Sequence, residues 1–386
     1  MSGARLARSR LRMAAGLSVA LLTSAVVGGC TVGPRPPDDK ETAGQYARLE
    51  EFSRRMLDEG APAVLIEVRH AGQVWSHGAG VRDLDSREPA LASDQFQAGG
   101  ITESMVAVSV LKLAEEGRLS LDAQVSAYLP EFGEELHPPG PVTVGQLLTH
   151  RSGIPDFFVP LLRSGPPQDV LNRPLSLEQQ LALAASVPWE PKLAQGFEYS
   201  NSDYSALGLI VQRLRGRGIA EVLKADIADP LGLQATRLPD GKPAPGTMVH
   251  GYIMVDGKRL DVTQPAWLSE LAPGGVVSTV GEVNTFYAAL LQGKLLASAT
   301  MAGMRGPDRN VYGQGLWKWN DTCTNRFYYG HNGDTAGYGI VSMASEDGTR
   351  QVTLAVAYRP DPPTLELNPL ISEMEDVAVE TLNGLC

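Results

Sequence analysis

Segments with the composition of β-strands lie at both ends of this 386-residue chain and enclose a helical middle. Near the N-terminus, residues 63–83 read AVLIEVRHAGQVWSHGAGVRD, which predicts two strands joined by a turn at residues 70–72. Near the C-terminus, RFYYGHNGD, YGIVSMASEDG and RQVTLAVAYR predict further strands. The interval of about residues 138–245 instead carries apolar residues at helical spacing. We therefore predict one sheet built from both ends of the chain, with an inserted α-helical part.

Helical patterns also flank the predicted strands, over residues 46–57 and 372–385, and residues 272–295 are interpreted as a loop followed by another helix. The domain that follows from this order covers residues 44–386. Its α/β part takes about residues 44–137 and 246–386, and the α-rich insertion takes about residues 138–245. A cleft between two such parts is the natural place for a binding or catalytic site.

The first residues have the pattern of an export signal. A basic stretch is followed by the apolar run AAGLSVALLTSAVVGG and by Val27-Gly28-Gly29-Cys30. We interpret residues 1–29 as a lipoprotein signal peptide, Cys30 as the acylated residue, and residues 30–43 as a Pro-rich tether to the membrane. An uncleaved membrane anchor and plain secretion are the alternatives. All three interpretations put the domain outside the cytoplasm.

The net charge, the cysteines and the histidines limit which partners, compartments and metal sites the sequence is compatible with. The formal charge is −11, and it becomes about −15 once the four arginines of the basic stretch are removed. No Lys/Arg-rich run follows the N-terminus, which argues against nucleic acid as a partner. Cys323 and Cys386 predict a disulfide in an oxidising compartment, with two free thiols as the alternative. His70, His77, His137 and His250 show no metal-ligand spacing, so neither a metal nor a cofactor is expected.

A Gly-rich turn opens a helix within residues 96–122, FQAGGITESMVAVSVLKLAEEGRLSLD. Gly99 and Gly100 break the chain, apolar residues then recur at helical spacing, and Gly117 ends the run. The start of such a helix gathers free N–H groups and suits chemistry. The turn itself, however, holds Gly-Gly-Ile-Thr-Glu, with two glycines and a carboxylate where an enzyme would place a nucleophile and its base.

Three short stretches resemble the motifs of one family. They are GGITE after Phe96, FEYSNSDYSALG with Tyr199-Ser200-Asn201, and YYGHNGDTAGYG with His331-Asn332-Gly333. In this order, with GQLLTHRSGIPD and LAPGGVVSTVGEVNTFYAALL between them, they resemble the penicillin-recognising serine hydrolases. That family includes class C β-lactamases, esterases and D-alanyl-D-alanine carboxypeptidases. The resemblance covers about residues 51–386, and the tail with its two cysteines looks most like the Streptomyces carboxypeptidase branch. It implies an α+β, β-lactamase/transpeptidase-like fold with an antiparallel sheet.

The chemistry of that family shows which motif positions carry a different residue in this sequence. In that family a Ser at a helix start attacks a carbonyl, and a Lys one turn later accepts its proton. By resemblance, Tyr199 and Asn201 fill the Tyr-x-Asn motif, and His331 and Gly333 fill the strand motif. The nucleophile position falls on Gly100 and the Lys position falls on Glu103. Glycine has no oxygen to attack with, and Glu reverses the charge of the proton acceptor, so serine hydrolysis by the family route is excluded.

Neighbouring hydroxyls do not replace the missing serine. Ser109 and Lys112 form a literal Ser-x-x-Lys, but it lies well inside the predicted helix, where no N–H groups are free. Thr102 and Ser104 are nearer to the turn, but on a helix they point away from the Gly100 direction.

The substrate end of the motif has also changed. Carboxypeptidases of this branch hold a terminal carboxylate with strand hydroxyls and an Arg. The corresponding positions carry Asn332 and Asp334, and the Arg position falls on Trp317, with Lys318 as the alternative in an alignment open by one residue. An Asp near an anionic substrate is unfavourable.

Three hypotheses follow. The first is a pseudoenzyme: a lipid-anchored binding or regulatory protein at the cell envelope, with a cell-wall peptide, an ester or a protein in its cleft. The second is a hydrolase in which a water occupies the space left by Gly100. Glu103 then acts as its base, and Tyr199 and His331 shuttle the proton. The third is a structural protein whose cleft is blocked, for example by Trp317 or Tyr338. His150, in the LTHRSG turn, is interpreted as structural.

Overall fold

The computed structural model describes residue 44 and residues 46–189, 196–239, 247–264, 271–361 and 368–386. Ala43–Cys386 form one compact unit. The predicted signal peptide and tether, with Cys30, lie outside the described residues. None of the helices within the described ranges has the length and apolar character that a membrane crossing requires.

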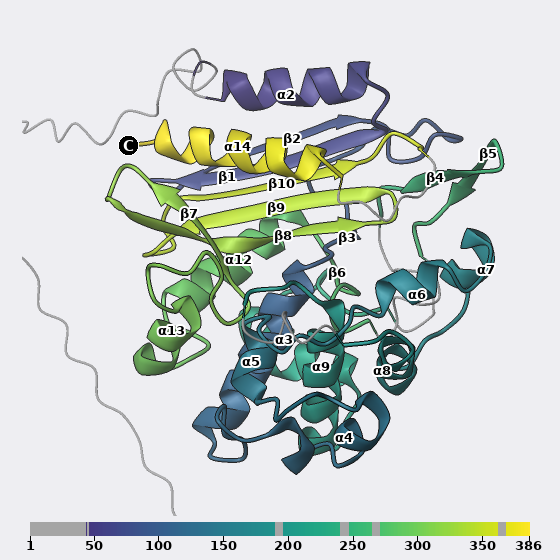
Figure 1. Cartoon of the computed structure of the whole chain (residues 1–386). Helices are drawn as coiled ribbons and strands as arrows, with labels where there is room; N and C mark the ends of the chain where they lie inside the picture. The colour runs from purple at the N-terminus through teal and green to yellow at the C-terminus, as the bar shows by residue number, and fades with distance from the viewer. Residues whose placement is uncertain (1–43, 45, 190–195, 240–246, 265–270, 362–367) are drawn as a thin grey trace, which may run out of the picture. The chain divides into compact units, whose positions relative to one another are not determined.

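A six-stranded antiparallel sheet has the order β2-β1-β10-β9-β8-β7. Its strands are β1 (Ala63–His70), β2 (Gln73–Gly80), β7 (Trp317–Asp321), β8 (Arg326–Thr335), β9 (Tyr338–Ser345) and β10 (Gln351–Ala357). β1 pairs with β10, with Ala63 opposite Ala357. The two ends of the chain therefore meet in the middle of the sheet, which confirms the prediction of one sheet built from both ends (Figure 1).

Helices cover both faces of this sheet. α2 (Ala47–Asp58) and α14 (Leu370–Asn383) lie on one face, while α12 (Val280–Leu291) and α3 (Ile101–Glu115) lie on the other (Figure 1). Because successive residues of a strand point to opposite faces, β1 divides its side chains between two cores. Val64, Ile66 and Val68 pack in the cluster with α2 and α14, whereas Ala63 and Leu65 pack in the cluster on the α3 side.

The inserted part is helical, and the predicted β-lactamase/transpeptidase-like fold class is confirmed. Its α-helices are α5 (Val144–Leu148), α6 (Phe158–Leu162), α7 (Pro167–Leu171), α8 (Leu177–Ala185), α9 (Asn201–Arg215), α10 (Ile219–Leu223) and α11 (Asp229–Leu231), and α4 (Glu131–Leu136) precedes it in the chain. Residues 219–232 form α10, a π-helical segment (Lys224–Ala228) and α11. The remaining elements are the 3₁₀-helix Val125–Ala127, α13 (Ser298–Arg305) and the short pairs β3–β6 (Phe96–Gln97, Val277–Ser278) and β4–β5 (Tyr252–Val255, Lys258–Asp261).

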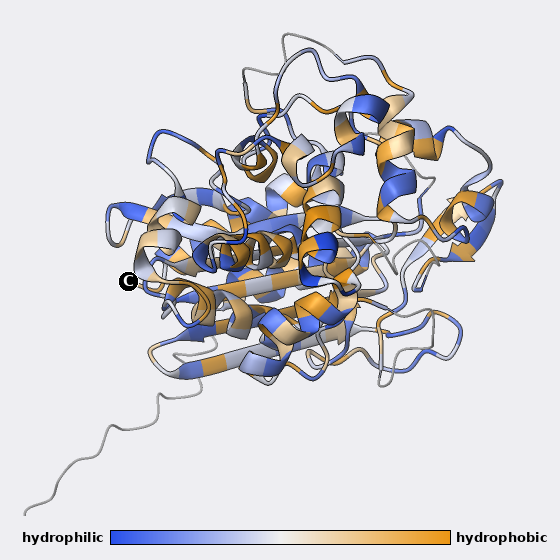
Figure 2. Cartoon of the chain, turned by 90° about the horizontal axis from the view of Figure 1, so that it is seen from below, coloured by the Kyte–Doolittle hydropathy of each residue, from blue (hydrophilic) through white to orange (hydrophobic). Residues whose placement is uncertain are grey.

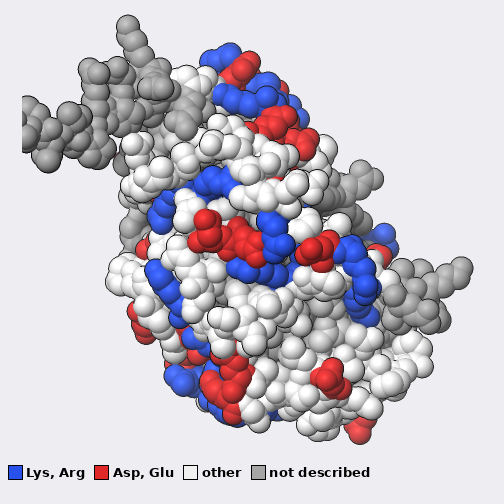
Figure 3. All heavy atoms as spheres, turned by 90° about the vertical axis from the view of Figure 1, so that its left-hand side faces the viewer, with Lys and Arg blue, Asp and Glu red and all other residues white. Residues whose placement is uncertain are grey.

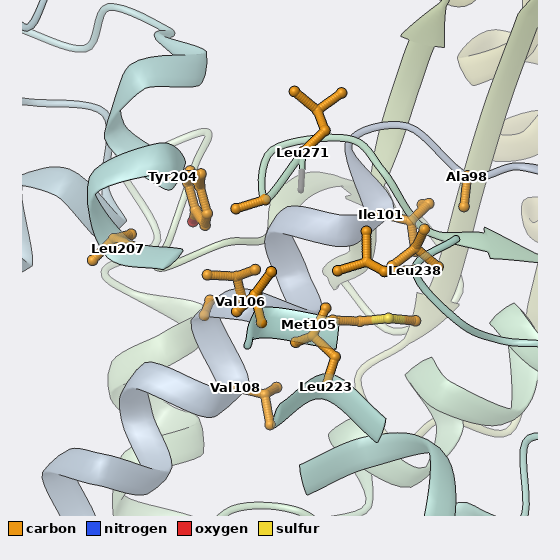
Figure 4. Packing of buried hydrophobic residues seen from close by; sticks show 14 of the residues in the cluster. Ala98, Ile101, Met105, Val106, Val108, Tyr204, Leu207, Leu223, Leu238 and Leu271 are labelled. Carbon is orange, nitrogen blue, oxygen red and sulfur yellow. The ribbon is translucent and has the colours of Figure 1, made fainter. Parts of the chain in front are cut away.

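α3 runs through the centre of the unit. Every residue from Ile101 to Leu111 is buried, so this helix is enclosed on all sides. Ile101 and Met105 pack beside Leu238 and Leu223, and Val106 faces the side of Tyr204 on α9 (Figure 4). Figure 2 shows the same arrangement by hydropathy, with hydrophobic residues on the central helices and hydrophilic residues in the surrounding loops. The N-terminus of α3 is thus held in place by both parts of the fold.

One end of the sheet is tied by ion pairs and by a disulfide. Arg350 binds Asp321 at 2.7 Å, and Glu346 binds both Arg305 and Arg326. On the face drawn in Figure 3, basic and acidic side chains are interspersed. Cys323 and Cys386, 63 residues apart, form a disulfide that joins the β7–β8 turn to the end of the chain after α14.

This bridge predicts a measurable stabilisation. Replacing Cys386 with Ser should lower the free energy of unfolding by roughly 2–4 kcal/mol, since the bridge closes a long loop in the unfolded chain. Urea unfolding of the purified domain measures the change. Reductant should destabilise the parent protein to the same extent and leave Cys386→Ser unaffected. Equal stability of the oxidised parent and the variant would contradict the prediction.

Candidate functional site

A cleft of about 1040 Å³ lies where the N-termini of α3 and α9 meet strand β8. Its wall includes most of the predicted site residues: Gly100, Tyr199, Asn201, Trp317, Gly333 and Asp334. Glu103 and His331 lie behind this wall and are fully buried. The structure thus brings together all the positions that the motifs marked, from three separate stretches of the chain.

Local structure explains how the helix starts are placed. Gly100 is the N-cap residue of α3, and Ser200 caps α9 with its hydroxyl, which accepts from the Ser202 N–H. The hydroxyls of Thr102 and Ser104 are buried and already used. Thr102 accepts from the Val276 N–H, and Ser104 donates to the Gly315 carbonyl. Neither hydroxyl lines the cleft.

The literal Ser-x-x-Lys is not a site either. Ser109 is fully buried inside α3, and Lys112 directs its ammonium to the carbonyl of Asp226 at 2.7 Å. This lysine therefore serves to tie α3 to the π-helical segment.

The backbone of β8 fills the place where a serine side chain would stand. A Cβ built on Gly100 would lie 2.5 Å from the carbonyl oxygen of Asn332 and 2.8 Å from Nδ1 of His331. A Cβ on Gly333 would lie 2.8 Å from the Gly100 nitrogen. Side-chain atoms do not approach backbone atoms this closely, so both glycines are required by contact between α3 and β8. The strand therefore stands where the Cβ of a serine would lie, while Gly100 itself still borders the cleft. The water expected beside Gly100 stays a prediction.

Glu103 is the centre of a buried hydrogen-bond network. Its Oε1 accepts from the Tyr199 hydroxyl at 2.9 Å. Its Oε2 lies 3.2 Å from the Tyr312 hydroxyl and 3.3 Å from Nε2 of both His150 and His331. The carboxylate has no exposed surface. It is held by partners on both sides and has no contact with the cleft.

A second carboxylate completes this arrangement. Nδ1 of His150 lies 3.0 Å from Oδ2 of Asp203, whose other oxygen accepts a hydrogen bond from Ser152. The His150 ring therefore lies between two carboxylates, one at each nitrogen. His331 is oriented differently. Its Nδ1 donates to the Asn332 carbonyl at 2.6 Å, and its Nε2 lies 3.0 Å from the Tyr312 hydroxyl.

The pKa values agree with a buried ion pair. Burial opposes the charged imidazolium, but Glu103 and Asp203 outweigh it and raise the pKa of His150 to about 9. Burial also acts to raise the pKa of Glu103, yet His150 and His331 hold it below its usual value. Burial raises the pKa of Asp203 to about 6 against the hydrogen bond from His150. At neutral pH, Glu103 is therefore an ionised, fully hydrogen-bonded carboxylate, which makes it a weak base.

The sequence analysis did not identify two members of this network. His150 was interpreted as structural, but the structure places it as the cation that compensates Glu103. The signal for it was indirect: an acid in an otherwise buried helix requires a positive partner. Tyr312 lies in the segment before β7, and no pattern around it indicates a site.

The opposite end of the cleft holds the changed substrate positions. Trp317 lines the cleft, while the neighbouring Lys318 turns away and donates to the carbonyls of Gly306 and Pro307. Of these two residues, Trp317 is therefore the one that borders the cleft. Tyr338 is fully buried and donates to the Val249 carbonyl, so it does not block the cleft. Among the described residues, no group of His, Cys, Asp and Glu is arranged to hold a metal ion.

The buried ion pair predicts a pH dependence of stability. Since the pKa of His150 rises from about 6.5 in the unfolded chain to about 9, its contribution is fully present below pH 6.5 and is lost as the pH rises through 9. The free energy of unfolding should fall by roughly 3 kcal/mol over that interval. Urea unfolding at several pH values measures it. Glu103→Gln should flatten the curve, whereas a flat curve for the parent protein would refute the buried imidazolium.

Comparison with known proteins agrees with this geometry. The beta-lactamase family model matches residues 48–371. Over 234 residues the chain is 30% identical to esterase EstB of Burkholderia gladioli, covering 55% of this chain and 59% of the esterase. Over 287 residues it is 22% identical to penicillin-binding protein 4* of Bacillus subtilis, covering 70% and 62%. The chain therefore matches about three fifths of the length of each of these two relatives.

Solved structures share the fold. A D-stereospecific amidohydrolase from Streptomyces sp. superposes with a TM-score of 0.72 at 24% identity, covering 81% of this chain and 94% of that one. The D-amino acid amidase of Ochrobactrum anthropi, solved with D-phenylalanine, gives a TM-score of 0.74 at 21% identity, covering 88% and 99%. With the family match over most of its length, the chain belongs to the beta-lactamase family, among the penicillin-recognising serine hydrolases.

Proposed function

We propose that this protein is a non-hydrolytic member of its family, a pseudoenzyme that binds a ligand in the retained cleft. One observation carries the proposal: at Gly100 the contact with β8 leaves no room for a side-chain atom. The family nucleophile is thus absent, and its place is also closed. The cleft beside it remains open, with about 1040 Å³ of space and both the Tyr-x-Asn and the strand residues on its wall.

The proposal also includes where in the cell the protein acts. The signal-like N-terminus and Cys30 favour a lipid-anchored protein on the outer face of the cell membrane. There the cleft would meet cell-wall peptides, esters or a protein partner. The names of the relatives support a ligand of this kind, since they include a penicillin-binding protein, an esterase and an amidase solved with phenylalanine.

A hydrolase with altered chemistry is the second candidate, and the geometry counts against it. A general base must reach the proton that it removes. Glu103 is fully buried and bound by Tyr199, Tyr312 and His150, so no water in the cleft contacts it. The blocked-cleft hypothesis is disfavoured too, because Trp317 borders the open space without filling it.

The absence of turnover is the direct test. The protein from residue 31 onward should hydrolyse neither esters nor D-Ala-D-Ala peptides nor β-lactams. It should also form no penicillin adduct by intact mass, because no nucleophile stands at the start of α3. A relative with an intact Ser-x-x-Lys provides the positive control. Turnover that disappears in Glu103→Ala would overturn the proposal and establish a water-based hydrolase.

Restoring the family residues should also fail. In Gly100→Ser/Glu103→Lys, the serine would meet the Asn332 carbonyl and the lysine would lie beside the charged His150. We expect no acylation by penicillin. Overpacking in Gly100→Ser alone should lower the free energy of unfolding by about 1–3 kcal/mol.

Gly133→Ser is the matched control for that measurement. It makes the same substitution in α4, at a position where an added Cβ meets no atom within 4 Å outside its neighbours and its own helix backbone, so its stability should hardly change. Acylation of the double variant would show that β8 yields to a side chain, and that closure of the site is not what prevents catalysis.

A further inference from the structure

The ionisable groups on the cleft wall are mostly acidic. Within the described residues they are Glu59, Asp156, Asp334, Arg359, Asp361 and Glu373. Arg359 is paired with Asp361 at 2.8 Å, so it offers no free positive charge to a ligand. Glu59 and Glu373 both pair with Arg55. Two wall carboxylates, those of Asp156 and Asp334, have no basic partner among the described residues.

Each of these two carboxylates is fixed by neutral donors. Asp156 accepts from the N–H of Phe158 and from the backbone and side-chain amides of Asn201. Asp334 faces the cleft and accepts from the Asn368 N–H at 3.0 Å. Loss of water around them raises the pKa of both carboxyls, and no cation among the described residues offsets it. A positively charged ligand would supply the missing compensation.

A second feature lies next to Asp334. The hydroxyl of Tyr358 lines the cleft over Gly339, the residue that pairs with Asp334 across β8 and β9. Tyr358 is only 8% exposed; its hydroxyl interacts with the Asp334 carboxyl, and no described residue donates a hydrogen bond to its oxygen. An ammonium group at this position donates to the Tyr358 oxygen and to the Asp334 carboxylate together.

Aromatic and apolar groups provide the rest of the wall. Tyr199 keeps 38% of its surface exposed although its hydroxyl is tied to Glu103, so its ring is presented to the cleft. Trp317 also lines the cleft, and its Nε1 has no hydrogen-bond partner among the described residues. Phe158, Val159 and Leu162 extend the apolar side. Such surfaces attract both apolar groups and cations.

We propose that the cleft binds a ligand with a protonated amine on an apolar body, with the ammonium group at Asp334 and Tyr358. This inference rests on the proposed function, because it names the ligand class of the same cleft. The preferred charge is opposite to that of the carboxylate-bearing substrates that the motif resemblance implies. The apolar body lies against the rings of Tyr199 and Trp317.

Three fluorescent probes that differ only in their terminal group test this. Dansylcadaverine ends in an ammonium, its N-acetyl derivative is neutral, and dansyl-6-aminohexanoate ends in a carboxylate. The protein from residue 31 onward retains the whole compact unit and is titrated with each. We expect the amine to bind at least tenfold more tightly than the other two, and salt to weaken only the amine.

Variants locate the site. Asp334→Asn keeps the shape of the side chain and should weaken amine binding at least fivefold. Asp308→Asn makes the same change on an exposed acid that does not line the cleft, and it should have no effect. Thermal melting confirms that both variants fold.

The outcomes separate this inference from the proposed function. Equal or tighter binding of the neutral or acidic probe, full amine affinity in Asp334→Asn, or no binding of any probe would each overturn it. None of these results bears on turnover, which the hydrolysis assay decides independently.

Discussion

A carboxylate buried at the first turn of α3 governs how this centre is built. Glu103 has no exposed surface, and an isolated charge in that position would be prohibitive. It is tolerated because His150 is held in the charged form between Glu103 and Asp203. The start of a helix also favours a negative charge. Where the family motif has a lysine, this chain therefore has an acid whose compensating cation comes from the inserted α-helical part.

Two features of the site act together. Glu103 stands where the family motif has a lysine, and β8 occupies the position of a side chain at residue 100. With a glycine at position 100, the Asn332 carbonyl of β8 can approach α3 to a distance that excludes any side chain. In that position Asn332 also accepts from His331, which turns Nε2 of the same ring toward Tyr312 and Glu103. The hydrogen bonds of the network and the contact of two backbones thus fix the same arrangement. A single substitution at either position would leave the other still opposed to catalysis.

The fold could be predicted from the sequence because its information is local. Strand alternation in residues 63–83 and after residue 326, with helical spacing between them, is enough to place both ends of the chain in one sheet. The positions of Gly100, Tyr199 and Gly333 followed from motif order. The partners of Glu103 did not, because they depend on packing between elements distant in sequence. His150 lies 47 residues from Glu103 and Tyr312 lies 209 residues away. The contact that closes Gly100 depends likewise on how β8 lies against α3, which no local pattern encodes.

The cleft and the buried network differ in how fully their polar groups are satisfied. Behind the wall, Glu103, His150 and Asp203 compensate one another, so that region has little to gain from a ligand. On the wall, Asp334 lacks a cation, and the oxygen of Tyr358 beside it accepts no hydrogen bond from a described residue. A ligand gains most free energy on binding from charged or polar groups that have no partner in the free protein. For this reason a ligand has more to gain from the groups on the cleft wall than from the buried network behind it.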